Sequence, residues 1–313
     1  MKLEGIHHIT AITGDAPGNV DFYARVLGLR LIKKTVNQDD PTVYHLFYGD
    51  EEGAPGNDLT FFEYPGAAPG RAGAGMVHRV VWRVASPDAI GFWARRLGDE
   101  GIEARREDGA LLFADPEGLE HELAVADVAD APLIAHAAGV PDEVALQGFD
   151  AVRALTADPE ASRPLLEEAL AFEPRSPREF EARGSQRGGR IVYDVSDRRG
   201  VRGAGTVHHV AWATHTDEQE QWRERALAAG AHATPVIDRF YFRSVYFLEP
   251  SGVLFELATL GPGFTADEPL DTLGERLSLP PDYEPMRERL EQTLTPLPDT
   301  KGWRRTSAPS GAP

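Results

Sequence analysis

The chain has 313 residues, of which 42% are hydrophobic, and it carries a formal net charge of -18 at pH 7. This length predicts two domains or one repeated architecture, and so acidic a chain is a poor partner for nucleic acid or an anionic lipid surface. Because the chain has no cysteine, it cannot form disulfides, thiolate metal sites or cysteine nucleophiles, and any transition-metal site must use histidine and carboxylate ligands.

The N-terminal residues, M-K-L-E-G-I-H-H, lack the apolar stretch of a signal peptide, and no run of apolar residues is long enough to span a membrane. We therefore expect a cytoplasmic protein with no membrane or nucleic-acid partner. The sequence leaves a homo-oligomer open.

The first part of the chain predicts a β-α-β-β-β module. Residues 6–12 alternate and are rich in β-branched side chains, which is typical of a strand. After a turn at residues 14–17, residues 19–27 have helical spacing and end at Gly28, a residue typical of a helix C-terminus. Three strand-like runs follow, at residues 30–36, 43–48 and 59–63.

The same order of elements recurs in three further modules, least clearly in the third. The second module has a strand at 77–84, a helix at 87–98 and strands at 103–107, 111–114 and 120–125. The third has a strand at 149–155, a helix at 163–171 and strands near 179–182 and 190–195. The fourth has a strand at 207–213, a helix at 219–230 and strands near 234–237, 243–248 and 253–258. This pattern predicts an α+β fold.

Three segments contain the histidines and the carboxylate on which the functional prediction depends. They read G-I-H-H-I-T at residues 5–10, G-T-V-H-H-V-A-W at 205–212 and E-P-S-G-V-L-F-E-L at 249–257. Modules of this order, with a histidine in the first strand and a glutamate in the last, resemble the vicinal-oxygen-chelate superfamily, which includes glyoxalase I, extradiol dioxygenases and antibiotic-resistance proteins. The similarity is closest to the branch that cleaves the rings of hydroquinones.

The resemblance covers residues 1 to about 265 and implies two tandem domains with cup-shaped mixed β-sheets. We expect the N-terminal domain at residues 1–135 and the C-terminal domain at 145–265, each with two modules. Residues 266–313 form a tail, with one short helix at 283–293 and a polar, mobile end.

The modules can be aligned with one another from this sequence alone. Residues 205–212 align without gaps on 75–82, so that Arg79 corresponds to His209. The first module places His8 at this position, and the third places Ala151 there. Only modules one and four therefore offer a metal ligand in the first strand.

The last strand of each module aligns by counting four residues from the preceding glycine. This count gives Glu256 in module four, Glu122 in module two and Thr60 in module one, and it gives Tyr193 in the weak third module, where the alignment could be off by one. Glu122 has no accompanying histidine ligand and is interpreted as a relic or a solvated pair.

Only the pairing of modules one and four gives a complete ligand set: His8, His209 and Glu256. We therefore predict that these two modules share one metal site by lying edge to edge across the halves. Two histidines and one carboxylate form the facial triad of non-haem Fe(II) oxygenases, with three positions left open. Thr60 at the fourth place argues against the four-ligand site of glyoxalase-type members.

Other residues are predicted to surround the metal. If the strands are regular, His7 and His208 point away from their ligand neighbours; the resemblance implies that both belong to the second sphere, where His208 would orient or protonate substrate. Thr10 lies two residues from His8 and thus on the same face, as a hydrogen-bonding partner. The resemblance further implies that Tyr246 contacts the bound ring or oxygen and that Arg239 is a pocket arginine. For His45, core packing is preferred.

The leading hypothesis is an Fe(II)-dependent, extradiol-type dioxygenase that cleaves a hydroquinone or catechol-like ring with O2, in which Tyr246 and His208 manage proton transfer. Mn(II) is an alternative metal, because this ligand set does not strongly separate it from Fe(II). One rival function is a glyoxalase-like, metal-dependent isomerase or lyase. Another is a metal-free binding or resistance protein that holds its ligand in the same cup.

Overall fold

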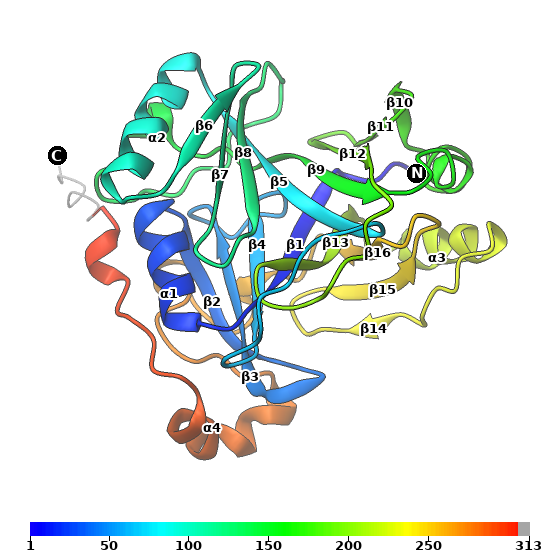
Figure 1. Ribbon diagram of the computed structural model, residues 1–313. Coiled ribbons are helices and arrows are strands. Elements are labelled where there is room, and N and C mark those ends of the chain that lie inside the picture. The colour runs from blue at the N-terminus through cyan, green and yellow to red at the C-terminus, as the bar shows by residue number, and fades with distance from the viewer. Residues whose placement is uncertain (306–313) are drawn as a thin grey trace, which may run out of the picture.

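The computed structural model describes residues 1–305 and folds them into two eight-stranded sheets (Figure 1). The first sheet has the strand order β14-β15-β16-β13-β1-β4-β3-β2. Its strands are β1 (Ile6–Thr13), β2 (Arg30–Asn37), β3 (Asp40–Gly49), β4 (Asp58–Glu63), β13 (Thr206–Thr214), β14 (Ile237–Asp238), β15 (Arg243–Leu248) and β16 (Leu254–Thr259).

The second sheet has the order β10-β11-β12-β9-β5-β8-β7-β6. Its strands are β5 (Met76–Val84), β6 (Ala104–Glu107), β7 (Ala110–Ala114), β8 (Glu120–Val125), β9 (Phe149–Thr156), β10 (Glu173–Ser176), β11 (Glu179–Arg183) and β12 (Gly188–Val195). Both sheets combine parallel and antiparallel pairs, and the α+β prediction is confirmed.

Each sheet is built from two modules that belong to different halves of the chain. Strand β1 pairs antiparallel with β13, so modules one and four form the first sheet, and β5 pairs antiparallel with β9, so modules two and three form the second. The predicted edge-to-edge contact of the first and last modules is confirmed. Both sheets contain strands from both halves of the chain, so the sheets do not test the domain boundaries at residues 135 and 145. These boundaries stay a prediction.

The strand register tests the alignment of the modules. The residue two positions after His8, namely Thr10, pairs with Thr60, and the residue two positions after His209 pairs with Glu256. In the second module, the residue two positions after Arg79 likewise pairs with Glu122. In the third module the equivalent residue is Val192, so the alignment on Tyr193 was off by one.

Helices cover the outer faces of the sheets and differ from the prediction at their ends. They are α1 (Ala16–Val20), continuing as the π-helical η1 (Asp21–Val26), α2 (Pro87–Asp99), the π-helical η3 (Leu165–Ala169) and α3 (Gln219–Ala228). The first helix begins inside the expected turn because the Asp15 side chain accepts a hydrogen bond from the Gly18 amide and caps it. Strand β10 was not predicted; it contains Pro174, which an edge strand tolerates because one row of its backbone groups has no partner.

The core repeats from one sheet to the other. Trp82 and Trp212 occupy equivalent places on β5 and β13, and Trp93 and Trp222 lie on α2 and α3, all four fully buried. Truncating such a side chain to alanine typically costs about 3–5 kcal/mol. These side chains therefore help to hold each helix against its sheet.

The C-terminal tail, from residue 264 to residue 305, lies beside the first module (Figure 1). It contains short 3-10 segments, η4 (Phe264–Ala266), η5 (Leu270–Thr272), η6 (Pro281–Met286) and η7 (Lys301–Trp303), and the helix α4 (Arg287–Thr293); a further 3-10 segment, η2 (Asp142–Val144), lies between the halves. The predicted helix at 283–293 is thus α only from Arg287. The polar end predicted to be mobile falls largely on residues 306–313, which lie outside the described residues.

No helix within residues 1–305 is both long and apolar enough to cross a membrane.

The two sheets meet at glycines that precede the first strands of modules one and four. Gly205 has a φ of 76°, and a Cβ there would overlap the backbone carbonyl of Glu117. We expect Gly205→Ala to lower the free energy of unfolding by at least about 2 kcal/mol, from left-handed strain plus the clash. Gly98→Ala is the matched control, since Gly98 lies in α2 with no atom near its absent Cβ; it should stabilise by about 0.5–1 kcal/mol. Equal denaturant midpoints for the two variants would contradict this account.

Candidate functional site

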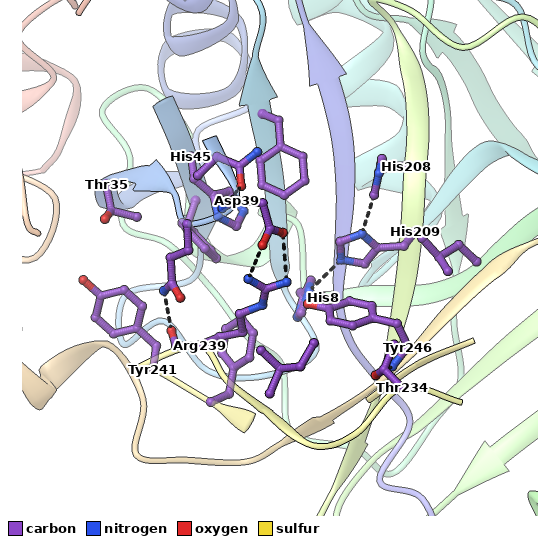
Figure 2. Close-up of a pocket in the computed structure, with 17 residues that line it drawn as sticks. His8, Thr35, Asp39, His45, His208, His209, Thr234, Arg239, Tyr241 and Tyr246 are labelled. Atoms are coloured by element: carbon purple, nitrogen blue, oxygen red, sulfur yellow. Dashed lines mark hydrogen bonds and ion pairs between the residues drawn. The ribbon is translucent and has the colours of Figure 1, made fainter. Parts of the chain in front are cut away.

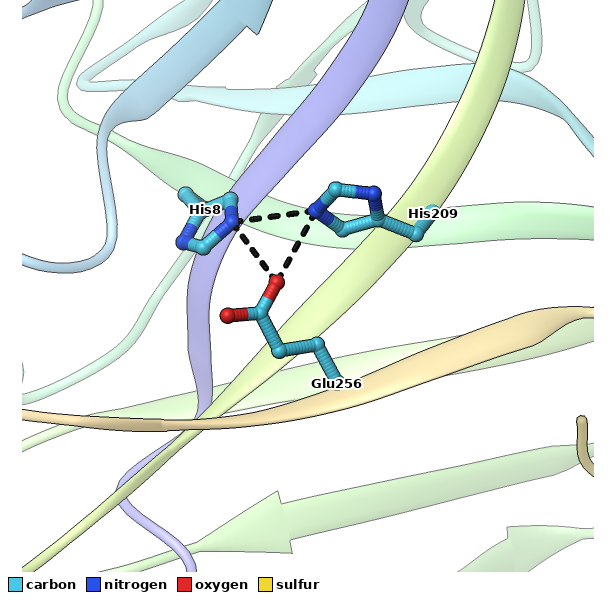
Figure 3. A group of neighbouring side chains, drawn as sticks. All are labelled: His8, His209 and Glu256. Atoms are coloured by element: carbon cyan, nitrogen blue, oxygen red, sulfur yellow. Dashed lines mark hydrogen bonds and ion pairs between the residues drawn. The ribbon is translucent and has the colours of Figure 1, made fainter. Parts of the chain in front are cut away.

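Three donor side chains converge where modules one and four meet (Figure 3). His8 comes from β1, His209 from β13 and Glu256 from β16, and all three are buried. The two Nε2 atoms lie 3.2 Å apart, and Glu256 Oε2 lies 3.1 Å from His8 Nε2 and 2.9 Å from His209 Nε2. The predicted convergence of two imidazoles and one carboxylate, from positions about 200 residues apart, is confirmed.

The spacing of these atoms fits one face of an octahedral ion. Metal bonds to imidazole nitrogen or carboxylate oxygen are about 2.1 Å long, so neighbouring ligands lie about 3.0 Å apart in an octahedron and about 3.4 Å apart in a tetrahedron. The observed separations, 2.9 to 3.2 Å, lie around the octahedral value. Among the described residues, buried Glu256 Oε2 faces only these two imidazole nitrogens; where neither nitrogen carries a proton, burial of the oxygen costs free energy that a cation would offset.

The hydrogen bonds of His7 determine the tautomer of His8. His7 Nε2 lies 3.1 Å from the carbonyl oxygen of Thr259, which can only accept, so this nitrogen carries the proton. Burial lowers the pKa of His7 to about 3, so the ring is neutral and its Nδ1 must accept. His8 Nδ1, 3.0 Å away, therefore donates, so in a neutral His8 ring the lone pair lies on Nε2, 3.1 Å from Glu256 Oε2. This is the tautomer that a metal ligand requires.

His208 and His209 repeat this arrangement on β13. Their Nδ1 atoms lie 2.8 Å apart, and burial lowers the pKa of both rings, that of His208 to about 3. When His209 Nε2 serves as a ligand, its Nδ1 donates to His208 Nδ1, and the Nε2–H of His208 remains free at the cavity wall.

The prediction that His7 and His208 point away from their neighbours is wrong, and β-bulges explain why. On β1 the register jumps between Ile6 and His8, and on β13 it jumps between His209 and Val207. The extra residue is His7 in the first case and His208 in the second. A bulge re-aims the side chain of the extra residue, and this brings each of these rings onto its ligand neighbour.

The remaining oxygen of Glu256 is held by a residue that the sequence did not single out. Ser244 Oγ donates to Glu256 Oε1 at 2.5 Å, and Ser244 is fully buried on β15. This bond leaves only Oε2 facing the histidines. Only the strand register could have indicated Ser244. Strands β15 and β16 pair antiparallel with Tyr246 opposite Glu256, and Ser244 lies two residues from Tyr246 on β15.

Thr10 belongs to a hydroxyl chain beside the donors and does not line the cavity. Its Oγ1 lies 2.8 Å from Thr60 Oγ1, which in turn lies 2.9 Å from His45 Nε2. The hydroxyl of Thr60 is thus engaged, and no carboxylate stands at the fourth place. His45, expected to pack in the core, lines the cavity with its ring against Phe47 and Phe62.

The donors open into a cavity of about 300 Å³ with mostly apolar walls (Figure 2). Tyr246 and Arg239 both line it, as predicted. The Tyr246 ring lies 5.7 Å from that of His209, and burial raises its pKa well above the usual value. The complete lining comprises His8, Thr35, Asn37, Gln38, Asp39, His45, Phe47, Phe62, His208, His209, Thr234, Ile237, Arg239, Tyr241, Phe242, Tyr246 and Leu254.

Comparison with known proteins places the chain in a family. A family model described as "Glyoxalase/Bleomycin resistance protein/Dioxygenase superfamily" matches residues 5–123. A protein of Bacillus subtilis (strain 168) named "putative ring-cleaving dioxygenase MhqO" is 42% identical over 306 residues, which cover 95% of this chain and 97% of the relative. The chain belongs to this superfamily.

Further comparisons relate the chain to the ring-cleaving branch of this superfamily. The chlorohydroquinone/hydroquinone 1,2-dioxygenase of Sphingobium indicum is 32% identical over 318 residues, covering 94% of this chain and 96% of that protein. A crystal structure from Bacillus subtilis, titled as that of a "putative dioxygenase", has a TM-score of 0.86 at 39% identity and covers 95% of this chain and 98% of its own. Glyoxalase I from Zea mays, at 17% identity and a TM-score of 0.58, covering 84% of this chain and 93% of its own, shares the superfamily fold alone. The resemblance to the hydroquinone branch is confirmed.

The second sheet lacks a metal triad at the equivalent positions. Arg79 stands where His209 does in the first sheet, and its guanidinium binds Glu122 Oε2 at 3.0 Å and Glu120 Oε2 at 2.9 Å. Ala151 occupies the place of His8. Glu122 is thus neutralised by an internal cation, and the triad in the first sheet is the only cluster of its kind in the described part of the chain.

Replacing one donor should weaken metal binding without unfolding the protein. We expect wild-type protein to bind about one divalent ion per chain and His209→Ala to lose at least about tenfold in affinity, since a two-donor site is incomplete. His232→Ala, which removes an exposed histidine outside the site, is the control. Metal content after dialysis and the metal-dependent rise in melting temperature are the measurements. Equal metal content in all three proteins would rule out this metal centre.

Proposed function

We propose that this protein is an Fe(II)-dependent, extradiol-type dioxygenase that cleaves the ring of a hydroquinone or a catechol-like aromatic with O2. The observation that carries the proposal is a buried cluster of three donors, His8, His209 and Glu256, of which both histidines line a cavity with aromatic walls. The names of the full-length relatives point to the same chemistry. Mn(II) remains the alternative ion, because the two metals accept the same donor set.

The number of protein ligands favours oxygenase chemistry. A two-histidine, one-carboxylate face leaves three octahedral positions for a chelating substrate and O2. The hydroxyl of Thr60 is bonded to Thr10 and His45 and does not supply a fourth donor. When bound, the ion would lower the pKa of a ring hydroxyl and allow electron density to pass from the ring to O2.

The side chains of the cavity would bind and orient the aromatic ring. Phe47, Phe62 and Phe242 line it and offer apolar and edge-to-face contacts for a ring of substrate size. Packing against these side chains would exclude water and keep the reacting oxygen beside the donors.

Proton transfer would fall to His208 and Tyr246. The Nε2–H of His208 is free because its Nδ1 is engaged by His209, so this ring can donate a hydrogen bond to a substrate oxygen. The Tyr246 hydroxyl is kept protonated by burial, and its ring lies 5.7 Å from that of His209, so it can donate to a substrate beside the metal donors. Arg239 would contact the ring's substituents, and His7 and Thr10 would act as positioning residues through His8 and Thr60.

Dioxygenase activity can be tested directly by gas consumption. We expect Fe(II)-loaded protein to consume about one O2 per hydroquinone molecule and to form a ring-opened product that retains both oxygen atoms, because the site offers adjacent positions for ring and O2. Oxygen-electrode traces with mass spectrometry under labelled O2 measure both. Turnover that continues unchanged without O2 would indicate an isomerase or lyase instead, and stoichiometric binding without turnover would indicate a binding protein.

Removing the Tyr246 hydroxyl should slow chemistry more than it weakens binding. We expect Tyr246→Phe to lower kcat by about 100-fold, the size of effect usual for a positioned proton donor, with metal content and KM little changed. Tyr44→Phe is the matched control, because Tyr44 lies on β3 beside His45 but packs in the core away from the cavity. A kcat within about twofold of wild type for Tyr246→Phe would exclude a role in proton transfer.

A further inference from the structure

The cavity contains one full charge of each sign besides its metal donors. Among the described residues that line it, Arg239 is the only lysine or arginine and Asp39 is the only aspartate or glutamate. Most of the other wall residues are aromatic or apolar, so these two side chains dominate the electrostatics that an incoming ring meets.

The two charged side chains pair with each other at the cavity (Figure 2). Arg239 Nη1 donates to Asp39 Oδ1 at 3.0 Å and Nη2 donates to Asp39 Oδ2 at 2.9 Å, a two-pronged pair that occupies the outer edge of the guanidinium. The Gln38 side-chain amide also donates to the Arg239 carbonyl at 2.8 Å. Residues 200 positions apart thus fasten the β2–β3 turn to the β14–β15 loop.

Arg239 is held in place from its other side as well. Its guanidinium lies 5.5 Å from the centre of the Tyr246 ring, in a cation–π contact. The side chain of Arg239 is 17% exposed and that of Asp39 is 71% exposed. The guanidinium therefore lies in the wall while Asp39 approaches it from the solvent side.

We propose that Asp39 determines substrate specificity by occupying Arg239, so that the cavity admits uncharged hydroquinones and rejects rings that carry a carboxylate. This inference rests on the proposed function. An unpaired guanidinium in such a wall would bind a carboxylate through its two parallel N–H groups. With Asp39 in place, a ring carboxylate would have to displace a carboxylate already bound or lie beside a like charge, and specificity of this kind commonly comes from such repulsion.

The test compares hydroquinone with 2,5-dihydroxybenzoate, which has the same hydroxyl pattern plus one carboxylate. We expect Asp39→Asn to raise the ratio of kcat/KM for the carboxylated ring over hydroquinone by about tenfold, a moderate effect because Asp39 is mostly exposed and its charge is partly screened. The double variant Asp39→Asn/Arg239→Gln should lose this gain. Glu52→Gln, which removes the same charge from an exposed position outside the cavity, should leave the ratio unchanged.

Equilibrium binding separates this inference from the proposed reaction. Calorimetry of the two aromatics with metal-loaded protein, under anaerobic conditions, should show the same shift in relative affinity for Asp39→Asn, reduced by added salt. If the affinities shift but neither compound is turned over, the proposed function fails while the role of Asp39 stands. If hydroquinone is turned over and the ratios of both affinity and kcat/KM stay at the wild-type value, the role of Asp39 is overturned.

Discussion

The antiparallel pairing of β1 with β13 is the constraint on which the site depends. It joins modules from opposite ends of the chain and places His8 and His209 on neighbouring strands, with Glu256 on the next strand along. Backbone hydrogen bonds set the separation of these strands to within a few tenths of an ångström. The side chains therefore start from positions that allow three donor atoms to lie at about the edge length of an octahedron. A loop-borne set would need far more side-chain packing to reach that accuracy.

The bulges in this pairing add a function that regular strands could not provide. Strict alternation would send His7 and His208 to the opposite face from the ligands. One extra residue on each strand instead turns both rings onto the Nδ1 atoms of their neighbours. Each candidate ligand imidazole thereby gains a hydrogen-bonding partner at Nδ1, and such a bond would strengthen metal binding by the Nε2 of the same ring. The same local irregularity leaves the Nε2–H of His208 free at the cavity wall.

The three metal donors could be predicted from the sequence because the repeated modules have the same order of strands. Equivalent positions in equivalent strands must face the same side, so comparing modules was enough to select His8, His209 and Glu256. It failed for the bulges, since a register shift depends on hydrogen bonding to a partner strand about 200 residues away. It missed Asp39 and Ser244 for a related reason: each acts through one contact with a residue on another strand or loop, and neither lies in a repeated motif.

The second sheet shows which features belong to the scaffold and which to the chemistry. Its central strands carry the same register shifts, here at His78 and Asp150, although no metal triad accompanies them. The bulge is therefore a property of the paired modules and not a response to a metal. What differs is how the re-aimed groups are satisfied: His78 Nε2 lies 2.9 Å from Asp194 and Arg79 is bound by Glu122, so these charges neutralise one another. In the first sheet Glu256 Oε2 and the Nε2 atoms of His8 and His209 face one another, and no lysine or arginine of the described residues contacts this carboxylate. A bound cation would satisfy this carboxylate, and the lack of an internal Arg partner for it distinguishes the first sheet from the second.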